Sequence, residues 1–564
     1  MWLVTLIAAI AGGYVWYSVN AINGSSGFPL DDSWIHLTFA RTLAQSAHFS
    51  YGALNPATSG STSPLFTFLE AILFLVTSNE FAVAKLLSIA GLILAVFFLF
   101  RATSAARPTA AWLPLAAAAL LVVSPRFLPA SVWGMETTFA GAFIAAAAYF
   151  YEKHSWRALG ITLGLSIWCR PDLALISLAL VIDYFFLRRE SVKPDWKQLL
   201  IPAIALGLAY VAFNFALSGS ILPNTFGAKL AYYKAHRPGF WGAAGGFFST
   251  QGQGLTIALA LIGLLAAIFS IFKKRILTPV YPFLIAIGFV ALYAWKLPYL
   301  YQDGRYLVPA CVALVLAAVF GANALVEWLA RGRFVSLAAI LVLVAAFIQF
   351  VSLTGSDFVA HEASEEAYIT NLQVATARWC ATNLPKDAAI ATHDIGAIGF
   401  YSGRKTVDMV GLVDPGIIPH IGDPVQTIRF LRKRGANYAA LLDNWFEIVN
   451  ENSVFAIRPP ESEHMLIYPL HDSTRMSGET VLSIHKFLKQ AIATQNTDGL
   501  DQAMAEATRL EPNNPMTYTL AGELLLELHR LPESQRMFET ALSYFPNSDM
   551  ARNDLHFITV MGKR

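Results

Sequence analysis

Long apolar runs dominate the first 353 positions of the chain, and polar residues gather in the short stretches between them. A helix needs about 20 consecutive apolar residues to cross the hydrocarbon core of a bilayer. About a dozen runs are judged against that length, and they lie near 2–19, 65–77, 81–100, 110–123, 137–151, 158–169, 173–187, 199–217, 255–272, 278–295, 306–329 and 334–353. The pattern predicts a polytopic α-helical membrane protein.

The basic residues between the runs predict the orientation. Lys and Arg favour cytoplasmic loops, so "LRRESVKPDWK", "FKKR" and "ARGR" are expected inside. Residues 218–252, 298–305 and everything after 352 then lie outside, as do "VWGMET" and "CRPD". This orientation conflicts with placing the loop after the first run outside. A chain that begins inside and ends outside needs an odd number of spans, whereas the number of runs is even. We therefore expect one short run, first of all 65–77, to be half-spanning or re-entrant.

The first run has neither a basic start nor a clear cleavage site, which favours an uncleaved anchor over a signal peptide. Composition agrees with a membrane protein, since 55% of the residues are hydrophobic, 14% are charged, and the mean hydropathy is +0.50. The net charge of +2 forms no basic face, which argues against a nucleic-acid partner. Three scattered cysteines without a CxxC motif predict neither a disulfide framework nor a thiolate metal site.

After residue 353 the composition becomes that of a soluble protein. Residues 358–482 predict a small α/β unit, made of the helix "EEAYITNLQVATARWCATNL", the strand "AAIATHD", the loop "IGAIGFYSG", the strand "KTVDMVGL", the helix "PVQTIRFLRKRG" and the strand "YAALLD". We place domain boundaries at 1–353 for the membrane part, 354–482 for the α/β part and 483–564 for a repeat block.

The repeat block is recognised by an offset of 34 residues between Pro512 and Pro546. The register matches the tetratricopeptide pattern, with Ala521 and Gly522 at the small positions where two helices cross. Two repeats and a terminal helix are too few for a free solenoid, so we expect them to lean on the α/β part.

Two adjacent carboxylates, Asp31 and Asp32, follow the first apolar run and precede an amphipathic helix pattern. Asp32 could cap that helix, because a carboxylate accepts the unpaired N–H groups of the first turn. One cap does not explain a second carboxylate, nor the hydroxyl-rich loop "YGALNPATSGSTSPLF". A carboxylate at the membrane surface can instead act as a general base toward an incoming alcohol. Both interpretations stay open.

Further polar groups are expected on the same side, and they are Glu136, Arg170, Asn224, Lys229, Asp303 and Arg305. A single Lys or Arg at an interface is most often a snorkelling anchor, and Asp172 offers Arg170 a local ion pair. Several such groups converging on one face fit a different interpretation. Basic side chains would hold a phosphate while a carboxylate activates an acceptor.

These residues resemble a known family. "DDSWIHLTFARTL", "SGSTSPLFTFLEA", "GMET", "RPD", "LPNTFGAKL", "GRYLVP" and "HDIGAIGFYSGRKTVDMVGLVDP" are similar, in this order, to motifs of bacterial GT-C integral-membrane glycosyltransferases. The likeness is to the cell-wall arabinofuranosyltransferase type and covers about residues 1 to 480. The repeat block lies outside it, and the family's "GYTN" appears here as "GSTS".

The resemblance implies about eleven to thirteen transmembrane helices with a C-terminal extracytoplasmic domain, in a bacterial cytoplasmic membrane. It implies transfer of a sugar from a polyprenyl-phosphate carrier to a cell-envelope glycan or another acceptor outside that membrane. Asp31 and Asp32 match the family's acidic motif, in which one carboxylate is the base. In-line displacement from the face opposite the phosphate would invert the anomeric configuration. The candidate binding residues are Arg305, Lys229, Arg170, Glu136, Asn224, His36, Arg41, Tyr306, His393 and Asp394.

Asp32 and Asp394 can also be interpreted as helix caps. Asp32 and His36, four residues apart, could share a divalent cation, but helix capping by Asp32 is the better supported interpretation. His393 and Asp394 end a predicted strand and open a helix, where they could bind sugar hydroxyls. An ordinary N-cap role for Asp394 is favoured over that site role. "IGAIGF" lacks the G-x-G-x-x-G order, so nucleotide binding is not supported.

Two other classes of function remain open. A polyprenyl-linked sugar transporter or flippase would also have about a dozen spans, but its charges should lie near the bilayer midplane. A non-catalytic envelope-assembly scaffold would dock a protein partner on the repeat block. A glycosyltransferase tethered to such an assembly combines both features.

Overall fold

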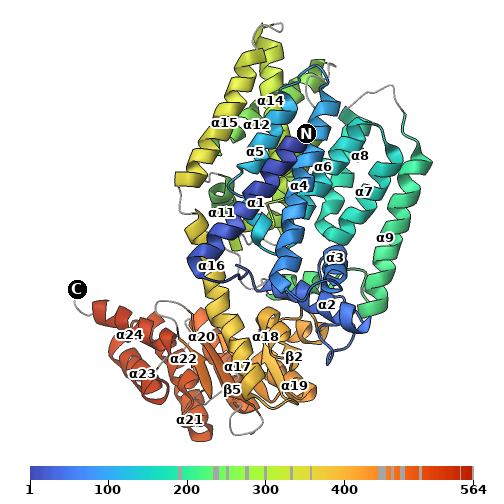
Figure 1. Ribbon diagram of the computed structural model, residues 1–564. Coiled ribbons are helices and arrows are strands. Elements are labelled where there is room, and N and C mark those ends of the chain that lie inside the picture. Colours follow the sequence, from blue (N-terminus) through green and yellow to red (C-terminus); the bar gives the residue numbers. More distant parts are fainter. Residues whose placement is uncertain are drawn as a thin grey trace. The chain divides into compact units, whose positions relative to one another are not determined.

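Figure 1 shows the computed structural model of the chain, in which the elements keep the labels used below. The structure describes residues 1–187, 193–232, 240–248, 253–273, 279–296, 302–330, 335–355, 358–442, 453–458, 463–470, 477–494, 498–546 and 548–561. The basic stretches that predict the orientation lie largely outside these residues.

The chain forms two compact units. The first contains Met1–Ser50, Ala57–Phe226 and Tyr233–Ile369, and the second contains Tyr51–Pro56, Gly227–Tyr232 and Thr370–Arg564. The polypeptide passes between the units four times before residue 370 and a fifth time there, so neither unit is one continuous stretch of sequence.

The first unit is a helical bundle built from the apolar runs. Its helices are α1 (Trp2–Asn23), α2 (Asp32–Ser46), α3 (Pro64–Phe74), α4 (Glu80–Ala106), α5 (Leu113–Val122), α6 (Thr137–Glu152), α7 (Trp156–Cys169), α8 (Ala174–Ile182), α9 (Trp196–Ser218), α11 (Phe240–Phe248), α12 (Gly254–Lys273), α13 (Tyr281–Lys296), α14 (Ala310–Ala330), α15 (Val335–Gly355) and α16 (Phe358–Ile369). Short 3₁₀ or π turns lie at η1 (Pro129–Val132), η2 (Pro171–Leu173), η3 (Asp183–Leu187) and η4 (Gln302–Gly304). Helix α10 (Asn224–Tyr232) crosses from the first unit into the second.

Several helices of this unit are candidate membrane spans. Among the described residues, α1, α4 and α9 are long and apolar enough to cross a bilayer, and a bent pair, Ala339–Leu353 with Phe358–Asn383, raises the count from 3 to 4. Further apolar helices are shorter, so the number of eleven to thirteen spans stays a prediction. Helix α3 has 11 residues, or about 16 Å at 1.5 Å per residue, about half of the bilayer core. Its length fits the half-spanning segment expected near 65–77, and Figure 1 shows it beside α2.

Small residues let neighbouring helices approach closely, which is the usual basis of helix packing in a membrane. A Cβ atom built on Gly164 of α7 would lie 2.7 Å from Cβ of Leu206 on α9. Gly263 of α12 faces the backbone of α14 in the same way, 2.7 Å from the carbonyl oxygen of Ala317. These glycines allow α7 to pack closely on α9 and α12 on α14.

The second unit contains a five-stranded sheet. Its strands are β1 (Ala389–Thr392), β2 (Lys405–Asp408), β3 (Tyr438–Leu442), β4 (Phe455–Ile457) and β5 (Met465–Pro469), in the order β2-β1-β3-β5-β4. Strand β1 pairs parallel with β2 and β3, with Ala391 opposite Val407 and Ala439, whereas β5 pairs antiparallel with β3 and β4. The three predicted strands are confirmed, but β4 and β5 were not predicted.

Helices complete the second unit. They are α17 (Ala375–Asn383), α18 (Ile395–Tyr401), α19 (Pro424–Arg434), α20 (Glu479–Thr494), α21 (Leu500–Leu510), α22 (Pro515–Glu527), α23 (Leu531–Tyr544) and α24 (Asp549–Met561), with the turns η5 (Thr370–Val374) and η6 (Pro415–His420). The prediction of a loop for "IGAIGFYSG" was wrong, because its first seven residues form α18.

Helices α20 to α24 form the C-terminal helical block. Gly522 of α22 faces α23 so closely that a Cβ atom there would lie 2.7 Å from the ring of Phe538. Leu482 and Phe545 of this block belong to the same hydrophobic cluster as strand residues of the sheet. The helices thus pack against the α/β part, while their assignment as tetratricopeptide repeats stays a prediction.

Candidate functional site

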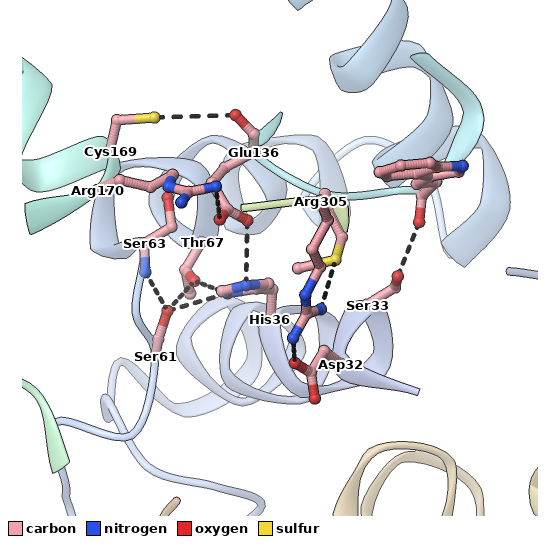
Figure 2. Close-up of polar contacts among 12 residues, drawn as sticks. Asp32, Ser33, His36, Ser61, Ser63, Thr67, Glu136, Cys169, Arg170 and Arg305 are labelled. Carbon is pink, nitrogen blue, oxygen red and sulfur yellow. Dashed lines mark hydrogen bonds and ion pairs between the residues drawn. The ribbon is translucent and has the colours of Figure 1, made fainter. Parts of the chain in front are cut away.

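The loop after α1 leads directly into α2 and carries both adjacent carboxylates. Asp31 occupies the N-cap position of α2, and Asp32 is the first helical residue. The capping role considered for Asp32 is therefore wrong, and the side chain of Asp31 makes no capping hydrogen bond either. Instead, the carboxylate of Asp32 accepts a hydrogen bond from the guanidinium of Arg305 (Figure 2).

Arg305 is held on several sides. Its guanidinium donates to the hydroxyl of Tyr306 at 3.0 Å and to the sulfur of Met135 at 3.3 Å. Its side chain is only 3% exposed, whereas the side chain of Asp32 is 22% exposed. A buried cation is thus paired with a carboxylate that solvent still reaches, which leaves the Asp32 end accessible to a ligand.

A second polar group surrounds His36, which lies one turn after Asp32 on α2. Its Nδ1 atom is 3.0 Å from the hydroxyl of Ser61, and that hydroxyl is 2.9 Å from the hydroxyl of Thr67 (Figure 2). Its Nε2 atom is 3.5 Å from the carboxylate of Glu136. Burial raises the pKa of Glu136, but His36 and the nearby Arg170 outweigh burial and lower it to about 2. Glu136 is therefore a fixed negative charge at neutral pH.

Arg170 links this group to a third one. Its guanidinium donates to both carboxylate oxygens of Asp172, at 3.1 and 2.5 Å, and to the hydroxyl of Tyr293 at 2.9 Å. A further guanidinium nitrogen is 3.9 Å from Glu136. The local ion pair considered for Arg170 is confirmed. Tyr293 in turn stacks on Tyr306, with ring centroids 5.2 Å apart, so the Arg170 and Arg305 groups meet through two aromatic rings.

A buried carboxylate belongs to the same neighbourhood. Glu70 on α3 has no exposed surface, and neither of its oxygens has a hydrogen-bonding group in the described part of the chain. A charged carboxylate is costly in such a place, so we expect the neutral, protonated form.

The remaining candidates make other contacts or belong to the second unit. Asn224 donates to Thr58 at 2.8 Å and also bonds Ser218, which ties the hydroxyl-rich loop to the end of α9. Arg41 is half-buried on α2. Lys229 belongs to the second unit, on α10, as do His393 and Asp394 after β1.

Asp394 lies at the predicted N-cap position, but the capping hydrogen bond predicted for its side chain is wrong. Asp394 occupies the N-cap position of α18 without a capping hydrogen bond. Its carboxylate accepts from the amide of Gln373 at 3.0 Å and lies 3.7 Å from Nε2 of His393. Burial lowers the pKa of His393, against the opposing effect of Asp394, so the imidazole is neutral at pH 7.

The geometry does not support a cation shared by Asp32 and His36, because Asp32 is engaged by Arg305 and His36 by Ser61 and Glu136. Within the described ranges, no group of three or more His, Cys, Asp or Glu side chains is arranged to hold a metal ion.

Comparison with solved structures identifies the fold of the chain. The oligosaccharyltransferase of Archaeoglobus fulgidus, solved in complex with Zn and sulfate, has a TM-score of 0.54 at 13% identity over 97% of this chain and 86% of that chain. ArnT from Cupriavidus metallidurans, solved bound to undecaprenyl phosphate, has a TM-score of 0.56 at 14% identity over 83% of this chain and 98% of that chain. The chain has the GT-C glycosyltransferase fold.

Other comparisons add less to this picture. The arabinofuranosyltransferase AftD from Mycobacteria has a TM-score of 0.43 at 14% identity, over 82% of this chain and 40% of that chain. A domain of unknown function, DUF8728, matches residues 362–494. Among curated proteins, no sequence is significantly similar to this chain. The resemblance to GT-C enzymes is confirmed at the level of the fold by the two structures with TM-scores of 0.54 and 0.56.

The fold brings together Asp32, Arg305 and Tyr306 in one group and His36, Glu136 and Arg170 in another, and all six are candidates of the sequence analysis. Sequence reasoning missed Ser61, Thr67, Met135, Tyr293 and Glu70. A glutamate inside the apolar run 65–77 was a usable signal. Tyr293 gave none, since an aromatic residue in an apolar helix is ordinary.

Proposed function

We propose that this protein is a membrane glycosyltransferase that transfers a sugar from a polyprenyl-phosphate-linked donor to an acceptor outside the cytoplasmic membrane, with inversion at the anomeric carbon. The observation that carries the proposal is the pair formed by the solvent-reached Asp32 and the buried Arg305. A base and a phosphate-binding cation are the two groups that this reaction requires.

The reaction follows from the properties of these two groups. Asp32 accepts the proton of the acceptor hydroxyl while the acceptor oxygen forms its bond to the anomeric carbon. The bond between that carbon and the phosphate oxygen breaks on the opposite face, and the phosphate leaves as an anion. Arg305 stabilises the charge that develops on the phosphate.

Pairing with Arg305 weakens Asp32 as a base, because a nearby cation favours the ionised carboxylate. An arriving donor phosphate competes for the same guanidinium. Part of the cation's charge is then shared with the phosphate, and the carboxylate becomes more basic when the donor is in place. This exchange restricts proton transfer to the donor-bound enzyme.

The surrounding groups orient the site. Glu136 and Asp172 neutralise Arg170, so we assign Arg170 to fixing Tyr293 and, through it, the ring of Tyr306. His36, held by Ser61 and Glu136, is assigned to acceptor or donor hydroxyls. Lys229, Asn224, Arg41, His393 and Asp394 stay candidates for substrate contacts.

The donor class is supported by the fold neighbours, one of which is ArnT solved with undecaprenyl phosphate. A polyprenyl tail keeps the donor phosphate at the membrane surface, and Asp32 begins a helix directly after the first candidate span. The acceptor is proposed to be a cell-envelope glycan, and the C-terminal helical block is proposed to bind a protein of the same assembly.

The test is transfer of radiolabelled sugar from a panel of polyprenyl-phosphate sugars by purified wild type, Asp31→Asn and Asp32→Asn proteins. Loss of a general base costs about 10²- to 10⁴-fold in rate, and we expect this loss for Asp32→Asn. Asp501→Asn, on the exposed side of α21, is the matched control and should be fully active.

Three results would argue against the proposal. Normal transfer by Asp32→Asn would remove Asp32 as the base, and loss only in Asp31→Asn would move that role to Asp31. No transfer from any donor, with the wild type folded, would favour the transporter or scaffold instead.

A further inference from the structure

Helix α16 is polar in sequence but carries two buried acidic side chains. Glu362 and Glu366 lie one turn apart and are only 3% and 1% exposed. Acidic residues are rarely buried to this degree unless they have partners. Their partners lie on segments far away in the sequence.

Glu366 binds the loop that precedes the two aspartates. One carboxylate oxygen accepts from the backbone N–H of Gly27 at 3.0 Å, and the other lies 2.5 Å from the ammonium of Lys85 on α4. Lys85 is fully buried, and its ammonium also faces the ring of Phe28 at 5.7 Å. The loop between α1 and α2 is thus attached to α16 and α4 five residues before Asp32.

Glu362 reaches the same place from the other side. Its carboxylate accepts from the indole N–H of Trp133 at 2.9 Å. The carbonyl oxygen of Trp133 accepts from the hydroxyl of Ser33 at 2.7 Å, and Ser33 directly follows Asp32. The two glutamates therefore hold the chain on both sides of Asp32.

Helix α16 also contacts the segment that carries Arg305. The Nε2 atom of His361 is 3.2 Å from the carboxylate of Asp303, two residues before Arg305. The carbonyl oxygen of Ala363 accepts from the amide of Asn23 at the end of α1 at 2.9 Å. One helix thus bonds the segments that carry both members of the Asp32–Arg305 pair.

We propose that α16 is a positioning helix for the Asp32–Arg305 pair, and that Glu366 and Glu362 are its positioning residues. The kinetic part of this inference rests on the proposed function. Asp32 begins α2, and the irregular loop that leads into it keeps Asp32 in place only if that loop is tied down. A misplacement of about 1 Å can reduce turnover about 10²-fold.

If Glu366 only stabilised the fold, the loop would not loosen while the thermal unfolding temperature stays unchanged. One double variant separates this stabilising role from the positioning role. Lys85→Met with Glu366→Leu removes both charges, and apolar replacement of a buried pair is often neutral or stabilising. The backbone N–H of Gly27 loses its acceptor in this variant. If Glu366 positions the loop, the thermal unfolding temperature stays near that of the parent while the loop loosens.

The loop is followed through a cysteine in place of Leu30, which is 5% exposed and adjacent to Asp31. The native Cys169, Cys311 and Cys380 are buried. We expect Leu30→Cys to react with a soluble maleimide about tenfold faster in the double variant than in the parent, because local opening exposes it. Glu366→Gln is measured beside it, with Glu533→Gln at an exposed ion pair as the matched control.

Turnover is measured in the same variants without the Leu30→Cys reporter. The expected result is a fall in kcat of about 10²-fold, with the donor KM nearly unchanged. Maleimide reaction at the parental rate in the double variant and in Glu366→Gln would overturn the proposal. If no donor is used by the parent, the proposed function fails, yet the labelling rates still decide whether α16 holds the loop.

Discussion

His485 should make a destabilising contribution to the C-terminal helical block on acidification. His485 on α20 has no exposed surface, and its Nε2 atom lies 2.8 Å from the hydroxyl of Thr517 on α22. Burial lowers the pKa of His485 to about 4, whereas an unfolded histidine has a pKa of about 6.5. Between these two pKa values, His485 is mostly protonated in the unfolded block and mostly neutral in the folded block.

The sign and size of the effect follow from proton linkage. A group with a lowered folded pKa contributes stability above its unfolded pKa and loses that stability as the pH falls. From pH 7.5 to pH 5.0, His485 should lower the free energy of unfolding of the block by about 2 kcal/mol. This is 1.36 kcal/mol per pH unit over the roughly 1.5 units between the unfolded pKa and pH 5.0.

A neighbouring carboxylate works in the opposite direction. Burial raises the pKa of Glu523 on α22 to about 7, with a further increase from Asp554 and a decrease from Lys489. Glu523 takes up a proton in the folded block as the pH falls, which stabilises that block at pH 5.0. The wild type alone would therefore underreport the effect of His485.

The assay is hydrogen exchange of α20 and α22 peptides in the purified protein, for wild type and His485→Gln at pH 7.5 and pH 5.0. Glutamine keeps a polar group near Thr517 but does not titrate. Relative to wild type, the variant should gain about 2 kcal/mol of opening free energy on acidification, in a double difference that cancels Glu523. An equal pH response in both proteins would refute the reasoning.

Two further predictions concern packing and a loop. Gly164→Ala should destabilise the first unit by about 1 to 3 kcal/mol, because the new methyl group meets Leu206. Gly207→Ala on the partner helix is the control and should be tolerated, because its new methyl group would lie 3.7 Å from the nearest atom. Equal thermal unfolding temperatures of the two variants would contradict the close packing of α7 on α9. Asp408→Ala should destabilise the loop after β2 by several kcal/mol, because the buried carboxylate accepts hydrogen bonds from four backbone N–H groups, those of Val410, Gly411, Val413 and Asp414. The measurement is the rate of proteolysis in this loop. An unchanged cleavage rate would show that the carboxylate does not hold the loop.

The sequence indicated the helical bundle and three strands because burial leaves a local trace. An apolar run such as 81–100 predicts a buried helix wherever its partners lie, and α4 follows it closely. Short strands such as β4, with three residues, leave too little pattern to be recognised.

The candidate site was only partly predictable. Asp32, Glu136 and Arg305 were found because charges next to apolar runs are unusual. The role of α16 could not be found, because "HEASEEAYI" has the composition of an exposed helix. Its burial depends on Lys85 and Trp133, more than 200 residues earlier.

The division of the chain at residue 370 falls inside a helical run that continues from α16 through η5 into α17. The family match begins at residue 362, within this same helix. A fragment cut at that point would present Glu362 and Glu366 to water without Trp133 and Lys85. Conversely, the bundle cut there would keep a buried lysine ammonium with no carboxylate opposite it. The boundary drawn by sequence families therefore separates two halves of one electrostatic unit, and a homologue that replaces the C-terminal domain should be expected to retain these first two turns.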